Sequence, residues 1–261
     1  MARDVVPADV ADISIDEILA IKHPDPPRWS PDGRWLAWRW DDGGQVSLWV
    51  SRSDGSGQKQ VSQGEASVGA FDWSPDGRLA FSQDTDIWIA QPNGNHPSQI
   101  TRGQSNDSAP RWSPVGERLA FVRNGGLIIH DFDAKCLTTC ELPGKVAAGY
   151  ADSISVRWSP DGERLASGVV CGTQRDLVVV NRSGEMIWRT DTPDDEAAFA
   201  WVDGQQLHVT QVDPTTRFRV HSLVNVDSGQ MRELVREDSH KGLKGELSPV
   251  VRPGGAGIAY I

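Results

Sequence analysis

The sequence predicts an all-β protein, a β-propeller built from four-stranded antiparallel blades. The first observation is a recurring Trp-Ser-Pro-Asp-Gly phrase, whose tryptophans lie at intervals of 44, 39, 46 and 43 residues: Trp29, Trp73, Trp112, Trp158 and, in a decayed copy, Trp201. A fixed period of roughly 40–45 residues is typical of repeat architectures. The second observation is that short apolar segments bounded by turn residues, as in strands, lie between the phrases. The third is that the 3.6-residue periodicity of helical repeats is missing there.

Each phrase predicts a β-hairpin. Pro31 presets φ near −65° at the second turn position, and Gly33 supplies the positive φ that closes the loop. One strand ends at the tryptophan before the turn. An apolar strand follows the turn, at 35–40 in the first unit and at 119–122 in the third.

Two more strands complete each unit and give the four strands of a propeller blade. We expect them, from the first unit to the fifth, at 46–50 and 58–61, 86–90 and 98–101, 127–132 and 138–142, 177–181 and 186–189, and 217–224 and 231–235. A decayed sixth phrase begins at Val251. The sequence therefore predicts a propeller over 25–261 with five complete blades and a half blade.

The N-terminal segment, 1–24, predicts one short helix. Ser14-Ile15-Asp16-Glu17 has the form of a capping box, an apolar stripe runs over 15–22, and Pro24 ends the helix. A short helix with one apolar face needs a surface to pack on. That surface is either the propeller rim or another domain.

Composition narrows the class of partners. The chain has 36 acidic and 26 basic residues and a formal net charge of −10, which gives no sign of a nucleic-acid face. No segment approaches the roughly 18 apolar residues of a membrane span, and the first residues lack the apolar run of a signal peptide. Three cysteines cannot form a disulfide framework. We therefore expect a cytoplasmic protein without nucleic-acid or membrane partners.

Three arginines are the candidate binding residues. Arg28, Arg111 and Arg157 occupy the same place before the repeated tryptophan, where Asp72 and Ala200 stand in the other two units. In one interpretation they make ion pairs between blades or hydrogen bonds to turn carbonyls. In the other they point into the axial channel and meet carboxylates or backbone carbonyls of a peptide. The sequence leaves both open.

The other conspicuous residues predict structural roles. We expect the repeated tryptophans to pack between blades, together with the strand residues Trp38, Trp40, Trp49 and Trp88. The turn aspartates stand singly, about one blade apart, so they favour turn formation over a calcium site. Val115 replaces the aspartate in the third copy, which supports that interpretation.

No catalytic residue, metal site or cofactor is expected. Cys136 and Cys140 are four apart and Cys171 is remote, so with His130 alone they do not provide the ligands of a zinc site. The histidines at 208, 221 and 240 show no partner that would complete a catalytic triad. No Gly-x-Ser-x-Gly nucleophile motif occurs in the 261 residues.

The phrase Trp-Ser-Pro-Asp-Gly followed by Leu-Ala-Phe resembles the propeller repeat of TolB and of the prolyl-oligopeptidase family of serine peptidases, over about 27–261. With the helix at 15–22 and its proline link, the start of the chain resembles acylaminoacyl-peptidase-type members. The resemblance implies that the helix packs against a C-terminal α/β-hydrolase domain. It also implies that the propeller admits only peptide-sized substrates to that domain.

Because the repeat array stops within a sixth unit, we expect a fragment of a larger peptidase, with the hydrolase domain and a peptide substrate as partners. Two alternatives stay open. One is a TolB-like propeller that binds a protein partner. The other is an independent propeller that closes by forming a homo-oligomer.

Overall fold

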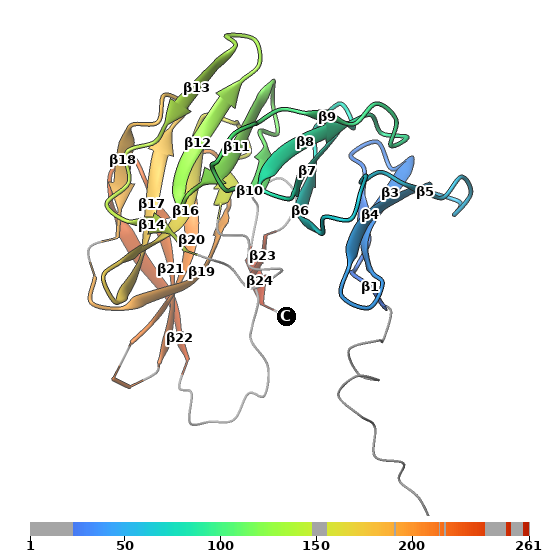
Figure 1. Cartoon of the computed structure of the whole chain (residues 1–261). Coiled ribbons are helices and arrows are strands. Elements are labelled where there is room, and N and C mark those ends of the chain that lie inside the picture. The colour runs from blue at the N-terminus through green and yellow to red at the C-terminus, as the bar shows by residue number, and fades with distance from the viewer. Residues whose placement is uncertain are drawn as a thin grey trace, which may run out of the picture.

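The computed structural model describes residues 23–147, 156–190, 192–213, 215–216 and 218–237, and the strands at 249–251 and 258–260. All regular secondary structure in these ranges is β (Figure 1). The predicted helix at 15–22, and with it most of the N-terminal segment, lies outside the described residues.

The described strands form five antiparallel sheets in chain order, followed by a hairpin. Blade 1 contains β1 (His23–Pro24), β2 (Arg28–Trp29), β3 (Trp35–Asp41), β4 (Val46–Arg52) and β5 (Lys59–Gln60); blade 2 contains β6 (Val68–Trp73), β7 (Leu79–Gln83), β8 (Asp86–Ala90) and β9 (Ser98–Gln99). Blade 3 contains β10 (Asp107–Trp112), β11 (Arg118–Arg123), β12 (Gly126–Asp131) and β13 (Cys136–Thr139); blade 4 contains β14 (Lys145–Val146), β15 (Val156–Trp158), β16 (Arg164–Cys171), β17 (Gln174–Asn181) and β18 (Met186–Arg189). Blade 5 contains β19 (Asp195–Trp201), β20 (Gln206–Val212), β21 (Arg219–Asn225) and β22 (Met231–Glu237), and β23 (Pro249–Val251) pairs with β24 (Ile258–Tyr260).

The blades follow one another around an open arc, from blue blade 1 to orange blade 5 (Figure 1). In blades 2, 3 and 5 each strand pairs with the next one along the chain. Blades 1 and 4 differ because two short pieces, β1 with β2 and β14 with β15, share the innermost place beside β3 and β16. The innermost strands of successive blades contact one another, so the residues on them line the centre of the arc.

The predicted blade count and strand order are confirmed, with small shifts at the strand ends. The largest shifts are of three residues: β17 begins at Gln174 instead of 177, and β13, which begins at Cys136, ends at Thr139 instead of 142. The hairpin of β23 and β24 supplies the first two strands expected of a sixth unit.

Turn chemistry explains the Ser-Pro-Asp-Gly part of the phrase. Gly33, Gly77 and Gly162 have φ values of 68°, 87° and 68°, a region that residues with a Cβ rarely adopt. In the first turn the Ser30 hydroxyl donates to Asp32 Oδ1 at 2.6 Å and accepts from the Trp35 amide at 2.9 Å. The serine thus links both sides of the turn.

The same serine–aspartate contact recurs in blades 2 and 4. Ser74 donates to Asp76, and Ser159 donates to Asp161. In blade 3, the Val115 side chain cannot accept such a bond, and Gly116 does not adopt a positive φ. The aspartates therefore serve the turns, as the sequence indicates.

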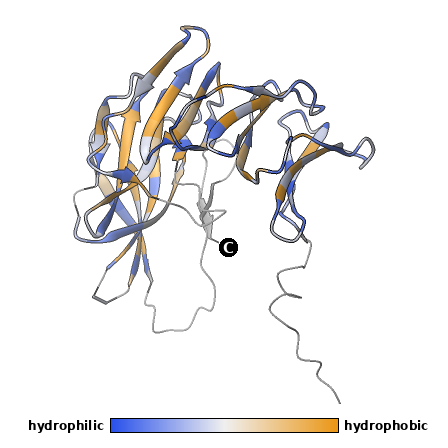
Figure 2. Cartoon of the chain, viewed as in Figure 1, coloured by the Kyte–Doolittle hydropathy of each residue, from blue (hydrophilic) through white to orange (hydrophobic). Residues whose placement is uncertain are grey.

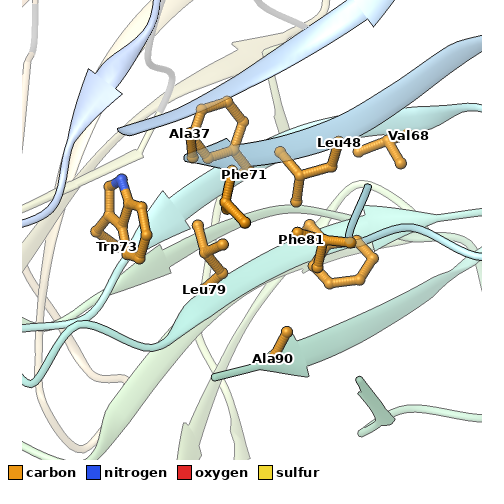
Figure 3. Packing of buried hydrophobic residues seen from close by; sticks show 10 residues of the cluster. Ala37, Leu48, Val68, Phe71, Trp73, Leu79, Phe81 and Ala90 are labelled. Atoms are coloured by element: carbon orange, nitrogen blue, oxygen red, sulfur yellow. The ribbon is translucent and has the colours of Figure 1, made fainter. Parts of the chain in front are cut away.

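The hydrophobic core lies between blades. Apolar residues follow the strands of every blade, while the connecting loops are mostly hydrophilic (Figure 2). Between blades 1 and 2, the β3 and β4 side chains Ala37 and Leu48 pack against Phe71, Trp73 and Phe81, all of them buried (Figure 3). Burying apolar side chains between neighbouring sheets is the main favourable contribution to the stability of such a fold.

The repeated tryptophans also hydrogen-bond across the blade interfaces. The indole Nε1 of Trp73 donates to the Arg28 carbonyl at 3.1 Å, that of Trp158 to the Arg111 carbonyl at 3.1 Å, and that of Trp201 to the Arg157 carbonyl at 2.9 Å. Trp112 departs from this pattern. Its buried Nε1 has no acceptor among the described residues, and its backbone amide instead donates to Asp72 Oδ2 at 2.8 Å.

This difference predicts unequal losses of stability for the same substitution at two equivalent places. Trp158→Phe keeps an aromatic ring but removes the bond to the Arg111 carbonyl, so it should cost about 1 kcal/mol more than the loss of ring volume alone. Trp112→Phe removes a buried donor that has no partner and should cost less. Urea unfolding of both variants measures the difference. Equal losses of stability would contradict a role for the indole bond.

Candidate functional site

The three candidate arginines lie on the innermost strands of three blades: Arg28 on β2, Arg111 on β10 and Arg157 on β15. Each precedes a tryptophan, and successive residues of a strand point to opposite faces. Trp112 and Trp158 are buried against the preceding blade, so Arg111 and Arg157 point the other way. Trp29 is 57% exposed, because no described blade covers its side of blade 1, so the expectation that it packs between blades is wrong for this copy. The carbonyl of each arginine accepts the indole bond from a later blade, which holds this part of the inner strand in place.

Arg28 contacts the next blade. Its guanidinium donates to the Phe71 carbonyl at 3.3 Å and lies 5.2 Å from the centre of the Phe71 ring. This carbonyl bond corresponds to the interpretation in which the arginines connect neighbouring blades. This bond occupies one of the five N–H donors of the Arg28 guanidinium.

Arg111 and Arg157 make fewer contacts with other blades than Arg28 does. Arg111 donates to the carbonyl of Pro110, its neighbour in the chain, at 2.8 Å. Arg157 makes no hydrogen bond or ion pair with any described residue. None of the three arginines has a carboxylate within 4.0 Å in the described part of the chain.

Electrostatics show that the three guanidinium groups lie near one another. Burial lowers the pKa of Arg111, Asp72 opposes this, and the charge of Arg28 adds to it. Burial also lowers the pKa of Arg157, and the charges of Arg111 and Arg28 lower it further. Arg28 and Arg157 belong to blades 1 and 4, with two blades between them. Their groups can therefore approach each other only across the centre of the arc.

Asp72 on β6 is the one acidic residue in this series. Burial raises the pKa of its carboxyl group, while Arg111, the Trp112 amide and Arg28 act in the opposite direction. One of its oxygens already accepts the Trp112 amide. The five equivalent inner-strand positions thus carry three positive groups, one negative group and Ala200.

A second feature is a cavity of about 640 Å³ on blade 1, lined by Trp38, Trp40, Trp49 and Leu36 among others. The register of β3 and β4 places Trp38 opposite Trp49, on the face away from blade 2. Among the extra aromatics, Trp88 packs at the interface of blades 1 and 2 as expected. Trp38, Trp40 and Trp49 do not, because no described blade covers their side of the sheet.

A buried acidic pair between blades 4 and 5 escaped the sequence prediction. Glu196 on β19 is 8% exposed and Asp176 on β17 is 6% exposed. Glu196 Oε1 accepts from Thr192 at 3.3 Å and from Gln211 at 3.4 Å, while Oε2 has no partner among the described residues. Burial, with a further contribution from Asp176, raises the pKa of Glu196 to about 7.

The cysteines are free thiols in three different environments: Cys136 is exposed, Cys140 is buried and Cys171 is intermediate. Burial raises the pKa of Cys140 to about 12, so it is not a reactive thiol near neutral pH. Cys140 directly follows the outer strand of blade 3. Thr101 and Thr190 hold the same place in blades 2 and 4, where their hydroxyls accept a strand amide.

The histidines form no catalytic arrangement in the described ranges. His208 and His221 stack with ring centroids 5.4 Å apart, and His221 Nδ1 lies 3.2 Å from Thr210 Oγ1. His240 lies outside the described residues. Where the structure describes side chains, no group of three or more His, Cys, Asp or Glu could hold a metal ion. Within the same ranges, no helix is long and apolar enough to cross a membrane.

No family model and no curated protein matches the chain in sequence. Solved structures do match in fold. A TolB protein of Agrobacterium tumefaciens is 20% identical with a TM-score of 0.53, and the match covers 82% of this chain and 81% of that one. A puromycin-hydrolyzing peptidase of Mycobacterium tuberculosis is 17% identical with a TM-score of 0.63, over 88% of this chain and 40% of that one.

Dipeptidyl peptidase 4 of Porphyromonas gingivalis is 13% identical with a TM-score of 0.69, over 98% of this chain and 46% of that one. The chain thus spans less than half the length of either peptidase. At these identities the similarity establishes architecture rather than activity. The chain has the β-propeller fold that TolB and these peptidases share.

Proposed function

We propose that this chain is the non-catalytic propeller of a serine peptidase of the acylaminoacyl-peptidase type. In this role it controls the access of peptides to an α/β-hydrolase domain. The observation that carries the proposal is the group of arginines at the centre of the arc, whose guanidinium donors are mostly unused by the described residues. A peptide offers carbonyls and a carboxylate to such donors. The fold likeness to two peptidases supports the same assignment.

In this proposal, acyl transfer takes place on residues of the hydrolase domain, and the propeller contributes selection by size and charge. Residues that line the centre of the arc contact the peptide before it reaches the nucleophile. The tryptophan indole bonds and the bonded turns keep these inner strands in position. A rigid support of this kind holds binding groups at defined places.

The test is peptide binding without hydrolysis. The purified chain is dialysed against N-acetylated heptapeptides, and both compartments are analysed by mass spectrometry for retained and for cleaved peptide. We expect retention, no cleavage, and no labelling by a fluorophosphonate probe. Serine labelling of this chain would overturn the non-catalytic role, and the absence of any peptide binding would overturn the peptide-gating role.

The second candidate is a TolB-like propeller that binds a folded protein, which the likeness to TolB favours. This alternative expects short peptides to bind weakly or not at all. It places the contact on an outer face of the propeller instead of on the inner strands. Substitution of Arg157 would then leave binding of the protein partner unchanged.

A further inference from the structure

The inner arginines can be assigned a more specific ligand than a peptide in general. Arg28, Arg111 and Arg157 lie on the innermost strands of blades 1, 3 and 4. Strand β10 contacts both β6 and β15, and Arg28 reaches the Phe71 carbonyl on β6, so the three charges surround one central space. Among the described residues of the inner strands, only Asp72 carries an opposing charge there. Three positive groups against one negative group leave an excess of two positive charges, within a chain whose formal net charge is −10. Such a local excess attracts an anion.

The described residues do not neutralise this excess. Asp72 uses one oxygen to accept the Trp112 amide, and no carboxylate lies within 4.0 Å of the three guanidinium groups in the described ranges. Arg28 and Arg111 each donate to one backbone carbonyl, and Arg157 donates to none of the described residues. Charged donors that are partly removed from water and lack an anionic partner are costly unless a ligand satisfies them.

Guanidinium groups recognise planar oxyanions, because two parallel N–H groups match the two oxygens of a carboxylate. On the basis of the proposed function, the anion that a short peptide always brings is its terminal carboxylate. We propose that Arg28, Arg111 and Arg157 form an axial site that binds the free C-terminal carboxylate of a peptide. Arg157 is the main anchor, since its donors are the least used. Asp72 orients the inner strand of blade 3 through the Trp112 amide.

The experiment compares two N-acetylated pentaalanine peptides, one with a free C-terminal acid and one with a C-terminal amide. Neither has a charged side chain, so the terminal carboxylate is the only difference in charge. We expect isothermal titration calorimetry to show that the acid binds the intact chain at least about 10-fold more tightly than the amide, the discrimination given by one charged hydrogen-bonded contact. Raising the salt concentration should weaken only binding of the acid.

Arg157→Gln should reduce the affinity for the acid about 10-fold, to the level of the amide, and leave the amide unchanged. Arg157→Lys keeps the charge but loses the planar fork and should give an intermediate affinity. Arg175→Gln removes an exposed arginine of β17 and serves as the matched control, with no expected change for either peptide. Circular dichroism of each variant confirms the fold, and Arg28→Gln replaces Arg157→Gln if that variant does not fold.

The outcomes separate this inference from the proposed function. If both peptides bind equally well, the carboxylate site is wrong while peptide binding stands. If neither binds, both are wrong. If a pentaalanine amide that ends in glutamate binds as well as the free acid, the site takes any carboxylate instead of the C-terminus. If millimolar inorganic phosphate displaces the acid peptide but acetate at the same concentration does not, the site is one for phosphate, and the proposal fails.

Discussion

Replacing Glu196 by glutamine is expected to stabilise the protein above neutral pH by up to about 3.5 kcal/mol, since a pKa that differs by one between the folded and the unfolded chain corresponds to about 1.4 kcal/mol. The Glu196 carboxyl has an ordinary pKa of 4.5, and burial raises it to about 7 in the folded chain. Between these values the folded protein retains a proton that the unfolded chain releases. The free energy of unfolding therefore falls as pH rises from about 4.5 to about 7, and below pH 4.5 the Glu196 carboxyl causes no loss of stability. Glutamine resembles the protonated acid and has no such cost.

Urea unfolding of wild type and Glu196→Gln at pH 5, 6, 7 and 8 tests this result. The two stabilities should be similar at pH 5 and diverge up to pH 8. Glu65→Gln changes an exposed glutamate and is the control, with an expected effect within about 0.5 kcal/mol at every pH. Parallel pH profiles for wild type and Glu196→Gln would show that the Glu196 carboxyl is not responsible for the pH dependence.

The opposite result is expected at the equivalent position of blade 3, which carries an ion pair. Asp107 pairs with Arg123 across β10 and β11, just as Glu196 pairs with Gln211 across β19 and β20. Arg123 binds both oxygens of Asp107 at 2.8 and 2.7 Å, and the Asp107 side chain is only 1% exposed. The two blades thus have the same carboxylate position, with a cation beside it in one and an amide in the other.

Arg123→Gln should therefore destabilise the protein by about 3 kcal/mol at neutral pH, because it leaves a buried carboxylate without its partner. The matched control is Arg34→Gln. Arg34 lies 3.8 Å from Asp32, with both side chains largely exposed, so its removal should cost less than about 0.5 kcal/mol. A loss below about 1 kcal/mol for Arg123→Gln would contradict a stabilising role for this pair.

The reciprocal substitution joins the two predictions. Gln211→Arg places a cation beside Glu196, as in blade 3, and should remove most of the decrease in stability between pH 5 and pH 8. The same urea series measures it. If Gln211→Arg steepens the decrease, or leaves it unchanged, the register equivalence does not explain the behaviour of Glu196.

The blade architecture was predictable because its signals are local. Pro31 and Gly33 encode a turn within a few residues, and a short apolar run such as Trp35–Trp38 after the turn encodes a strand. Repetition of the phrase made the number of blades countable. Strand ends such as that at Cys136 were less certain, because they depend on pairing with a neighbouring strand.

The candidate site was only partly predictable. The common position of Arg28, Arg111 and Arg157 is a property of the sequence, but the distance between their charges in space is not. Glu196 gave no signal, because its importance depends on Gln211 standing opposite it and on Asp176 in another blade. An alignment of the repeats by strand register would have revealed the match with Asp107 and Arg123.

The sequence by itself determined the repeating unit, its turns and the tryptophan at each blade interface, since each follows from residues that are close together in the chain. The tertiary structure alone decided that charges from blades 1, 3 and 4 share one central space, and that the two acids of blades 4 and 5 are buried together. The physical reason is that desolvation and Coulomb interactions depend on distance in space. Sequence separation does not report that distance when about 130 residues lie between Arg28 and Arg157.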